Sequence, residues 1–102
     1  MRRTRSYQAR RASRSEVRTL RFLLGLEAHE YTHLYRIMKK TGTSRATVHG
    51  HLRALRAAGY LQVTRGPSQR GPQRKPCRLT PEGRRFAEKR IEEYIIERAI
   101  AA

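Results

Sequence analysis

A short stretch near the middle of the chain carries side chains that suit contact with a phosphate or a base edge. Ser44 and Thr47 offer hydroxyl groups, and Arg45, His49 and Arg53 recur every four residues. Guanidinium and imidazole groups donate hydrogen bonds to phosphate oxygens and to base-edge acceptors, and the free N–H groups at a helix N-terminus attract anions. These residues therefore predict a surface that binds a polyanion.

The helix that would carry these side chains is predicted at about 44–58. Val48, Leu52 and Leu55 fall on one side of it and form its expected buried stripe. The opposite face consists mostly of small residues: Ala46, Gly50, Arg53 and Ala57. Glycine in mid-helix costs about 1 kcal/mol relative to alanine. Close approach to the floor of a DNA major groove would account for Gly50, and packing of Gly50 against another helix is the alternative.

The neighbouring segments must position this helix. Hydrophobic periodicity and capping signals predict helices at 15–26, 31–40, 44–58 and 81–99, and strands at 60–65 and 77–80. Gly42 lies in a predicted tight turn, Ser44 or Thr43 is the expected N-cap that follows, and Gly59 should end that helix. The fold class is therefore mainly α with a small β-hairpin.

The charge balance narrows the class of partner. The chain of 102 residues has a net charge of +16, and no acidic residue occurs from Tyr31 to Pro81. Such an imbalance predicts a polyanionic partner, whether DNA, RNA or an anionic membrane surface. No apolar run approaches the roughly 18 residues that span a bilayer, and no signal peptide is evident, so a cytoplasmic protein is expected.

Two basic segments flank the predicted helices. Residues 1–14 contain six arginines and no acid, which predicts a flexible N-terminal arm. The loop at 66–76 is rich in glycine and proline and also carries Arg70, Arg74 and Lys75. Both segments are expected to contact the DNA backbone or enter a minor groove, while 15–80 would form the main domain.

Three stretches of the chain resemble a known family. TGTSRATV at 41–48 with LRALRAAGYL at 52–61, and RLTPEG at 78–83, resemble bacterial winged-helix regulators, PadR-like repressors nearest and MarR-like regulators next. The resemblance implies a winged helix-turn-helix fold, with the helix at 44–58 in the major groove and the loop at 66–76 as the wing. PadR-like proteins often have an aromatic pair where this chain has Pro76 and Cys77.

The last predicted helix, within 81–102, mixes acidic and basic residues with more apolar residues than one small core needs. Ile91, Tyr94 and Ile95 are expected to pair with the same helix of a second copy, as terminal helices do in the resembled families. A twofold dimer would match a palindromic operator. The alternative is that this helix only packs back on the first helix.

The residue types give little support for catalysis or for metal binding. The chain contains no aspartate, no phosphate-binding glycine motif and no nucleophile elbow, so neither an enzyme nor a cofactor is expected. Cys77 is the single cysteine and is expected to be a small buried residue. His49 and His51 point apart on a helix, so no metal site is predicted. A pocket for an effector of unknown identity is expected only at a dimer interface.

The predicted function is that of a transcriptional regulator, a repressor as the resemblance implies, which binds duplex DNA as a homodimer. A plasmid or phage factor for partition, replication or immunity, built on the same fold, is one alternative. A basic RNA-binding protein is the other.

Overall fold

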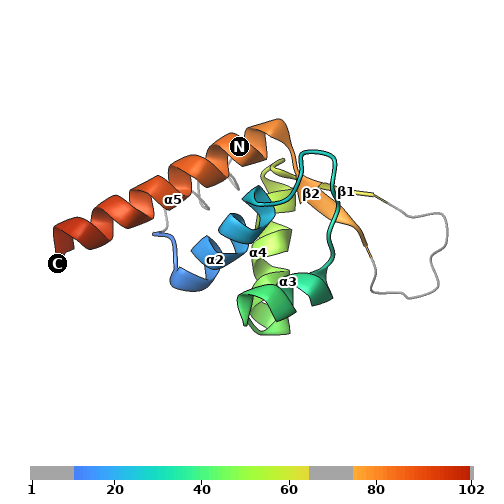
Figure 1. The fold of residues 1–102 in the computed structure, drawn as a ribbon, viewed down its shortest axis with the longest axis horizontal. Coiled ribbons are helices and arrows are strands. Elements are labelled where there is room, and N and C mark those ends of the chain that lie inside the picture. The colour runs from blue at the N-terminus through green and yellow to red at the C-terminus, as the bar shows by residue number, and fades with distance from the viewer. Residues whose placement is uncertain (1–10, 65–74, 102) are drawn as a thin grey trace.

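The computed structural model describes residues 11–64 and 75–101. Its elements are the helices α2 (Arg14–Leu24), α3 (Leu34–Thr41), α4 (Arg45–Ala57) and α5 (Pro81–Ala101), and the strands β1 (Leu61–Val63) and β2 (Cys77–Leu79). The two strands pair antiparallel, with Gln62 opposite Arg78. The prediction of a mainly helical fold with a small hairpin is confirmed. The hairpin and the C-terminal end of α5 extend from opposite ends of the molecule (Figure 1).

The core lies where α2, α3 and α4 meet. Leu20, Leu23, Ile37, Val48 and Leu55 are each at most 1% exposed, and each comes from the apolar stripe expected for its helix. The hairpin and the first half of α5 close this core from the outside. Burial of these stripes is the main term that holds the short helices together, because isolated helices of this length are marginal in water.

α4 begins and ends at the predicted signals. The Ser44 hydroxyl accepts a hydrogen bond from the Thr47 N–H at 3.3 Å, which caps the helix. Gly42 just before it has φ 66°, and Gly59 just after it has φ 85°; both values favour glycine. Local chemistry alone therefore fixes where this helix starts and stops.

α3 begins three residues later than the predicted start at Tyr31. Thr32 instead pairs with Cys77 in an antiparallel bridge, with N–H···O distances of 2.9 and 2.7 Å in the two directions. His33 then caps α3, because its Nδ1 accepts a hydrogen bond from the Arg36 N–H at 3.4 Å. The backbone before α3 is thus an added edge of the hairpin rather than a helical turn.

Cys77 is 2% exposed, as expected for a small buried residue. Desolvation by this burial raises the pKa of its thiol from 9.0 to about 11. The thiol therefore stays neutral at physiological pH and packs as an apolar group.

The first turn of α5 packs through Gly83 against the backbone of Tyr60, the residue just before β1. Thr80 caps α5 by accepting a hydrogen bond from the Gly83 N–H at 3.0 Å. A Cβ at Gly83 would overlap the carbonyl oxygen of Tyr60 and lie 2.9 Å from its carbonyl carbon. The final glycine of the RLTPEG stretch is therefore required by direct backbone packing.

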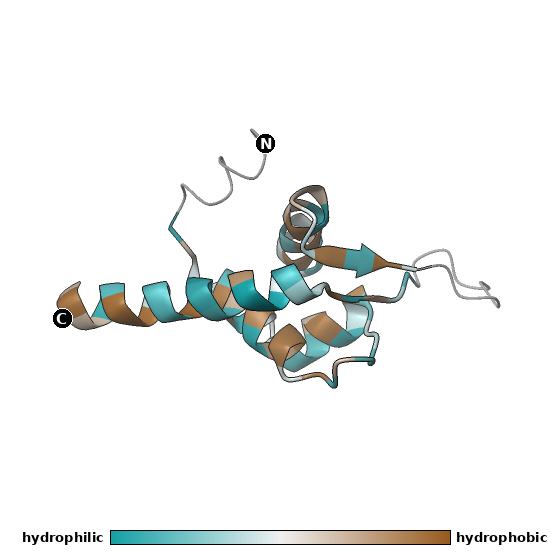
Figure 2. Cartoon of the chain, turned by 90° about the horizontal axis from the view of Figure 1, so that it is seen from above, coloured by the Kyte–Doolittle hydropathy of each residue, from teal (hydrophilic) through white to brown (hydrophobic). Residues whose placement is uncertain are grey.

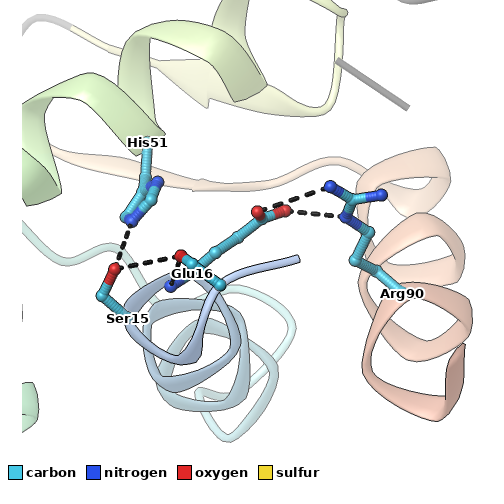
Figure 3. A network of polar contacts seen from close by, with 5 residues as sticks. Ser15, Glu16, His51 and Arg90 are labelled. Atoms are coloured by element: carbon cyan, nitrogen blue, oxygen red, sulfur yellow. Dashed lines mark hydrogen bonds and ion pairs between the residues drawn. The ribbon is translucent and has the colours of Figure 1, made fainter. Parts of the chain in front are cut away.

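A buried ion pair joins α2 to α5. Arg90 of α5 donates from Nε to Oε2 of Glu16 in α2 at 2.8 Å, and both residues are only 5% exposed. Beside it, Ser15 and His51 of α4 form a hydrogen bond at 3.1 Å. Figure 3 shows His51 and Arg90 reaching the start of α2 from two different helices. These contacts fix α4 and α5 to one point on α2.

Candidate nucleic-acid interface

The exposed side of α4 carries a row of basic residues. Arg45, His49, Arg53 and Arg56 are all exposed, and their spacing of four, four and three residues places them along one flank of the helix. We call these four residues the basic row. Arg56 was not among the residues predicted to bind DNA, although its spacing from Arg53 is a signal that would have found it.

The outermost face of α4 is as bare as the sequence suggests. Ala46, Gly50 and Ala57 are exposed, and a Cβ added at Gly50 would meet no atom of the described residues within 4 Å. The alternative that Gly50 packs against another helix is therefore wrong. With nothing in residues 11–64 and 75–101 to explain this glycine, the face is available to a partner.

Two predicted contact residues are occupied with each other. The hydroxyl groups of Ser44 and Thr47 lie 3.0 Å apart and form a hydrogen bond, in addition to the cap. Ser44 is exposed, while Thr47 is half-buried. A phosphate contacted by these hydroxyl groups would therefore lie at the N-terminus of α4, which the same groups already cap.

The basic row faces the hairpin across a shallow pocket of about 150 Å³. Leu34, Leu52, Leu61, Val63 and Cys77 form its apolar surface, and it is rimmed by side chains of His49, Arg53, Arg56 and Lys75. Lys75, a predicted wing residue, thus lies across the pocket from three members of the basic row. Arg70 and Arg74, with most of the predicted wing at 66–76, lie outside the described residues, as do residues 1–10 of the predicted arm.

Other basic residues belong to the fold and not to this surface. Arg78 places its guanidinium 4.5 Å from the ring centre of Tyr31, and its Nε donates to the Gln62 side chain at 3.3 Å. Arg84 donates to the Leu24 carbonyl at 3.1 Å. Some of the basic residues in the described ranges are therefore used in structural contacts, whereas the basic row on α4 is exposed.

Neither a metal centre nor a membrane span is found in the part of the chain that the structure describes. Within residues 11–64 and 75–101, no three histidine, cysteine or acidic side chains group closely enough to hold a metal ion. No helix in the same ranges has the length and apolar content needed to cross a membrane.

Comparison with known families supplies the observation that decides the class. Residues 17–95 match the model of the winged helix DNA-binding domain. The chain belongs to this family. In the winged helix domain, α3 and α4 form the helix-turn-helix, and β1 and β2 form the hairpin of the wing.

Solved structures share this fold at low sequence identity. One describes how 6-hydroxynicotinic acid regulates DNA binding by BpsR of Bordetella bronchiseptica; the TM-score is 0.65 at 23% identity, over 94% of this chain and 70% of that one. Another is RV1404 of Mycobacterium tuberculosis, with a TM-score of 0.61 at 18% identity, over 97% of this chain and 65% of that one. Among curated protein sequences, none is significantly similar to this winged helix domain.

Proposed function

We propose that this winged helix domain is a transcriptional regulator that binds duplex DNA as a homodimer and acts as a repressor. The observation that carries the proposal is the exposed basic row beside the bare face of α4. A helix enters the major groove most closely where its side chains are small, while arginines at its edge contact phosphates or guanine. Regulation of DNA binding in BpsR, a structural neighbour, also supports this class of function.

The proposed contacts extend beyond the basic row. α4 would lie in the major groove, with the wing and the N-terminal arm on the backbone or in a minor groove. The residues proposed to contact DNA are Ser44, Arg45, Thr47, His49, Gly50, Arg53, Arg56, Arg70, Arg74 and Lys75. The PadR-like assignment and the repressor role rest on the resemblance of 41–61 and 78–83, and a cytoplasmic location would follow from a chromosomal target.

The far half of α5 is the proposed dimer surface. Ile95 and Ile96 are each 49% exposed and Ile100 is 79% exposed, on the part of the helix that extends beyond the body. Apolar and polar residues alternate along this part up to the C-terminal end (Figure 2). Ile91 and Tyr94 are half-buried, and Ile91 packs against the core. The proposed interface is therefore centred on Ile95 and reaches further toward the C-terminus than the sequence suggested.

Binding to duplexes selected in vitro, followed by mobility shift, tests the proposal. We expect a preference for a selected duplex over structured RNA. If about six phosphates are contacted, affinity should fall about 10³-fold or more between 50 and 200 mM salt. Tighter binding to RNA than to any duplex would favour the basic RNA-binding alternative and contradict the proposal.

Replacing Arg53 with alanine should weaken binding to the selected duplex. If Arg53 contacts a guanine, discrimination at that base should relax by about 1–3 kcal/mol. Arg21→Ala, an exposed change of equal charge on α2, is the matched control. An equal loss on selected and random DNA would assign Arg53 to a phosphate, and no loss beyond that of the control would remove it from the interface.

Ile95→Glu should convert the dimer to monomer, because it places a charge in an apolar interface. Sedimentation equilibrium across protein concentrations measures this change. Lys89→Glu, an exposed charge change on the same helix, should leave the mass of the dimer unaltered. A dimer that survives Ile95→Glu combined with Ile100→Glu would place the interface elsewhere.

A further inference from the structure

On its side toward α2, the bare face of α4 opens into a second hollow. Ala46, Gly50 and Ala54 form the α4 wall of a groove of about 300 Å³. Arg11 and Ser13, at the start of α2, form the facing wall. We call this hollow the α2-side groove. A water molecule takes about 30 Å³ in the liquid, so the groove has room for a group much larger than a single water.

The polar groups in the α2-side groove are Thr47, His51, Glu16 and Arg90, besides those of the facing wall. The negative charge of Glu16 is matched by Arg90 through the 2.8 Å contact, so this buried pair adds no net charge to the groove. The remaining charged group there is the guanidinium of Arg11. The groove therefore has a positive balance that suits an anion.

Arg11 is the cation best able to reach a ligand in this groove. Its side chain is 85% exposed, and its Nε lies 3.8 Å from Oε2 of Glu97, whose side chain is also exposed. Exposed pairs of this kind contribute little stability, and the long side chain reorients easily. Arg11 can thus exchange this contact for an anion beside α4.

The geometry of duplex DNA suggests which anion this is. The major groove is about 12 Å wide, so a helix lying in it has a sugar–phosphate backbone along each flank. Three residues of the basic row (His49, Arg53 and Arg56) and Lys75 line the pocket on the flank toward the hairpin. The backbone of the other strand must then pass along Ala46, Gly50 and Ala54, where the chain leaves a hollow instead of side chains.

We propose that the α2-side groove seats a backbone phosphate of the second DNA strand, held by Arg11. This inference rests on the proposed function, because it requires α4 to lie in a major groove. The basic row and the α2-side groove would then grip the two strands from opposite sides of α4. Gly50 has a second role in this arrangement, since a longer side chain there would extend into the space that the phosphate occupies.

The test pairs protein variants with selected duplexes in which one phosphate at a time is replaced by an uncharged methylphosphonate. Arg11→Ala should lower affinity about tenfold near 0.1 M salt and reduce the salt slope by about 0.9, as expected for one lost phosphate contact. A methylphosphonate at the phosphate contacted by Arg11 should weaken the unmodified protein but not the variant. The phosphates that couple to Arg56→Ala should lie on the opposite strand.

Arg21→Ala carries the same loss of charge outside the groove and is the control; thermal unfolding checks that each variant is folded. An Arg11→Ala effect equal to that of Arg21→Ala, or coupling of Arg11 and Arg56 to the same strand, would overturn the inference while the proposed function stands. Failure of the unmodified protein to bind any duplex would overturn both.

A free anion is the other possible source of a phosphate group. Inorganic phosphate and chloride are therefore compared at equal ionic strength as competitors of DNA. Equal competition is expected. Protection of the protein against thermal unfolding by inorganic phosphate that is lost in Arg11→Ala, together with an unchanged DNA affinity of that variant, would assign the groove to a free anion and overturn the DNA contact.

Discussion

Gly83→Ala is expected to lower the free energy of unfolding by about 3 kcal/mol, at the upper end of the usual cost of overpacking. The added methyl group would overlap the backbone of Tyr60, and a backbone carbonyl cannot move aside as the end of a side chain can. Relief would require α5 to shift away from the end of α4, which would disturb the stack of Tyr60 and Phe86 at 4.4 Å. Urea unfolding followed by circular dichroism measures the change.

Gly50→Ala is the matched control, since the same methyl group is added to a helix where nothing lies within 4 Å. It should raise stability by about 0.5–1 kcal/mol, because alanine loses less backbone freedom than glycine on folding. The two substitutions should therefore have opposite signs. Equal stability of the Gly83→Ala variant and the unmodified protein would show that α5 does not pack on Tyr60 as described.

Arg90→Met should cost about 3–5 kcal/mol, because it leaves the carboxylate of Glu16 buried without its partner. Methionine keeps much of the length of the arginine side chain, so the loss reports the missing charge more than a missing volume. The measurement is again urea unfolding, at a fixed pH and salt concentration.

A second variant separates loss of the ion pair from damage to the fold. Glu16→Leu combined with Arg90→Met removes both charges, and replacing both partners of a buried pair by apolar groups is often neutral or stabilising. The double variant should therefore recover most of the stability that Arg90→Met loses. A double variant as unstable as Arg90→Met alone would mean that shape, and not charge, makes this site important.

Local sequence signals predicted most of the fold. The cap at Ser44, the turn at Gly42 and the apolar stripe of α4 each depend on neighbours a few residues away. Such signals can be read in one pass along the chain. They are sufficient here because the family fold is assembled from short, well-capped elements.

The features that the sequence did not predict depend on distant partners. The start of α3 is set by the pairing of Thr32 with Cys77, and the pair of Glu16 and Arg90 spans 74 positions. Periodicity contains no information on which remote residue completes a strand or neutralises a buried charge. The space beside Gly83 is likewise a property of the packed structure and not of its own helix.

The candidate site was predicted in part for the same reason. The exposed face of α4 follows from its helical spacing, so the exposure of Arg45, His49 and Arg53 was predicted correctly. The sequence alone does not distinguish exposed arginines from arginines that make structural contacts. The structure shows that Arg56 is exposed, whereas Arg78 and Arg90 stabilise the fold. The α2-side groove required three helices to be placed together before it could be seen.

The long projection of α5 also bears on how the protein meets its target. α5 carries five acidic and five basic residues and is nearly neutral, whereas no acid occurs between Tyr31 and Pro81. Within the described residues, the projecting half of α5 holds three acidic residues and one arginine, so the excess of positive charge lies on the rest of the domain. Such an offset gives each chain a large electric dipole moment. The field of a polyanion exerts a torque on this dipole, so encounters are biased, before any contact forms, toward orientations in which the projecting half of α5 points away from the polyanion, and the benefit appears in the association rate.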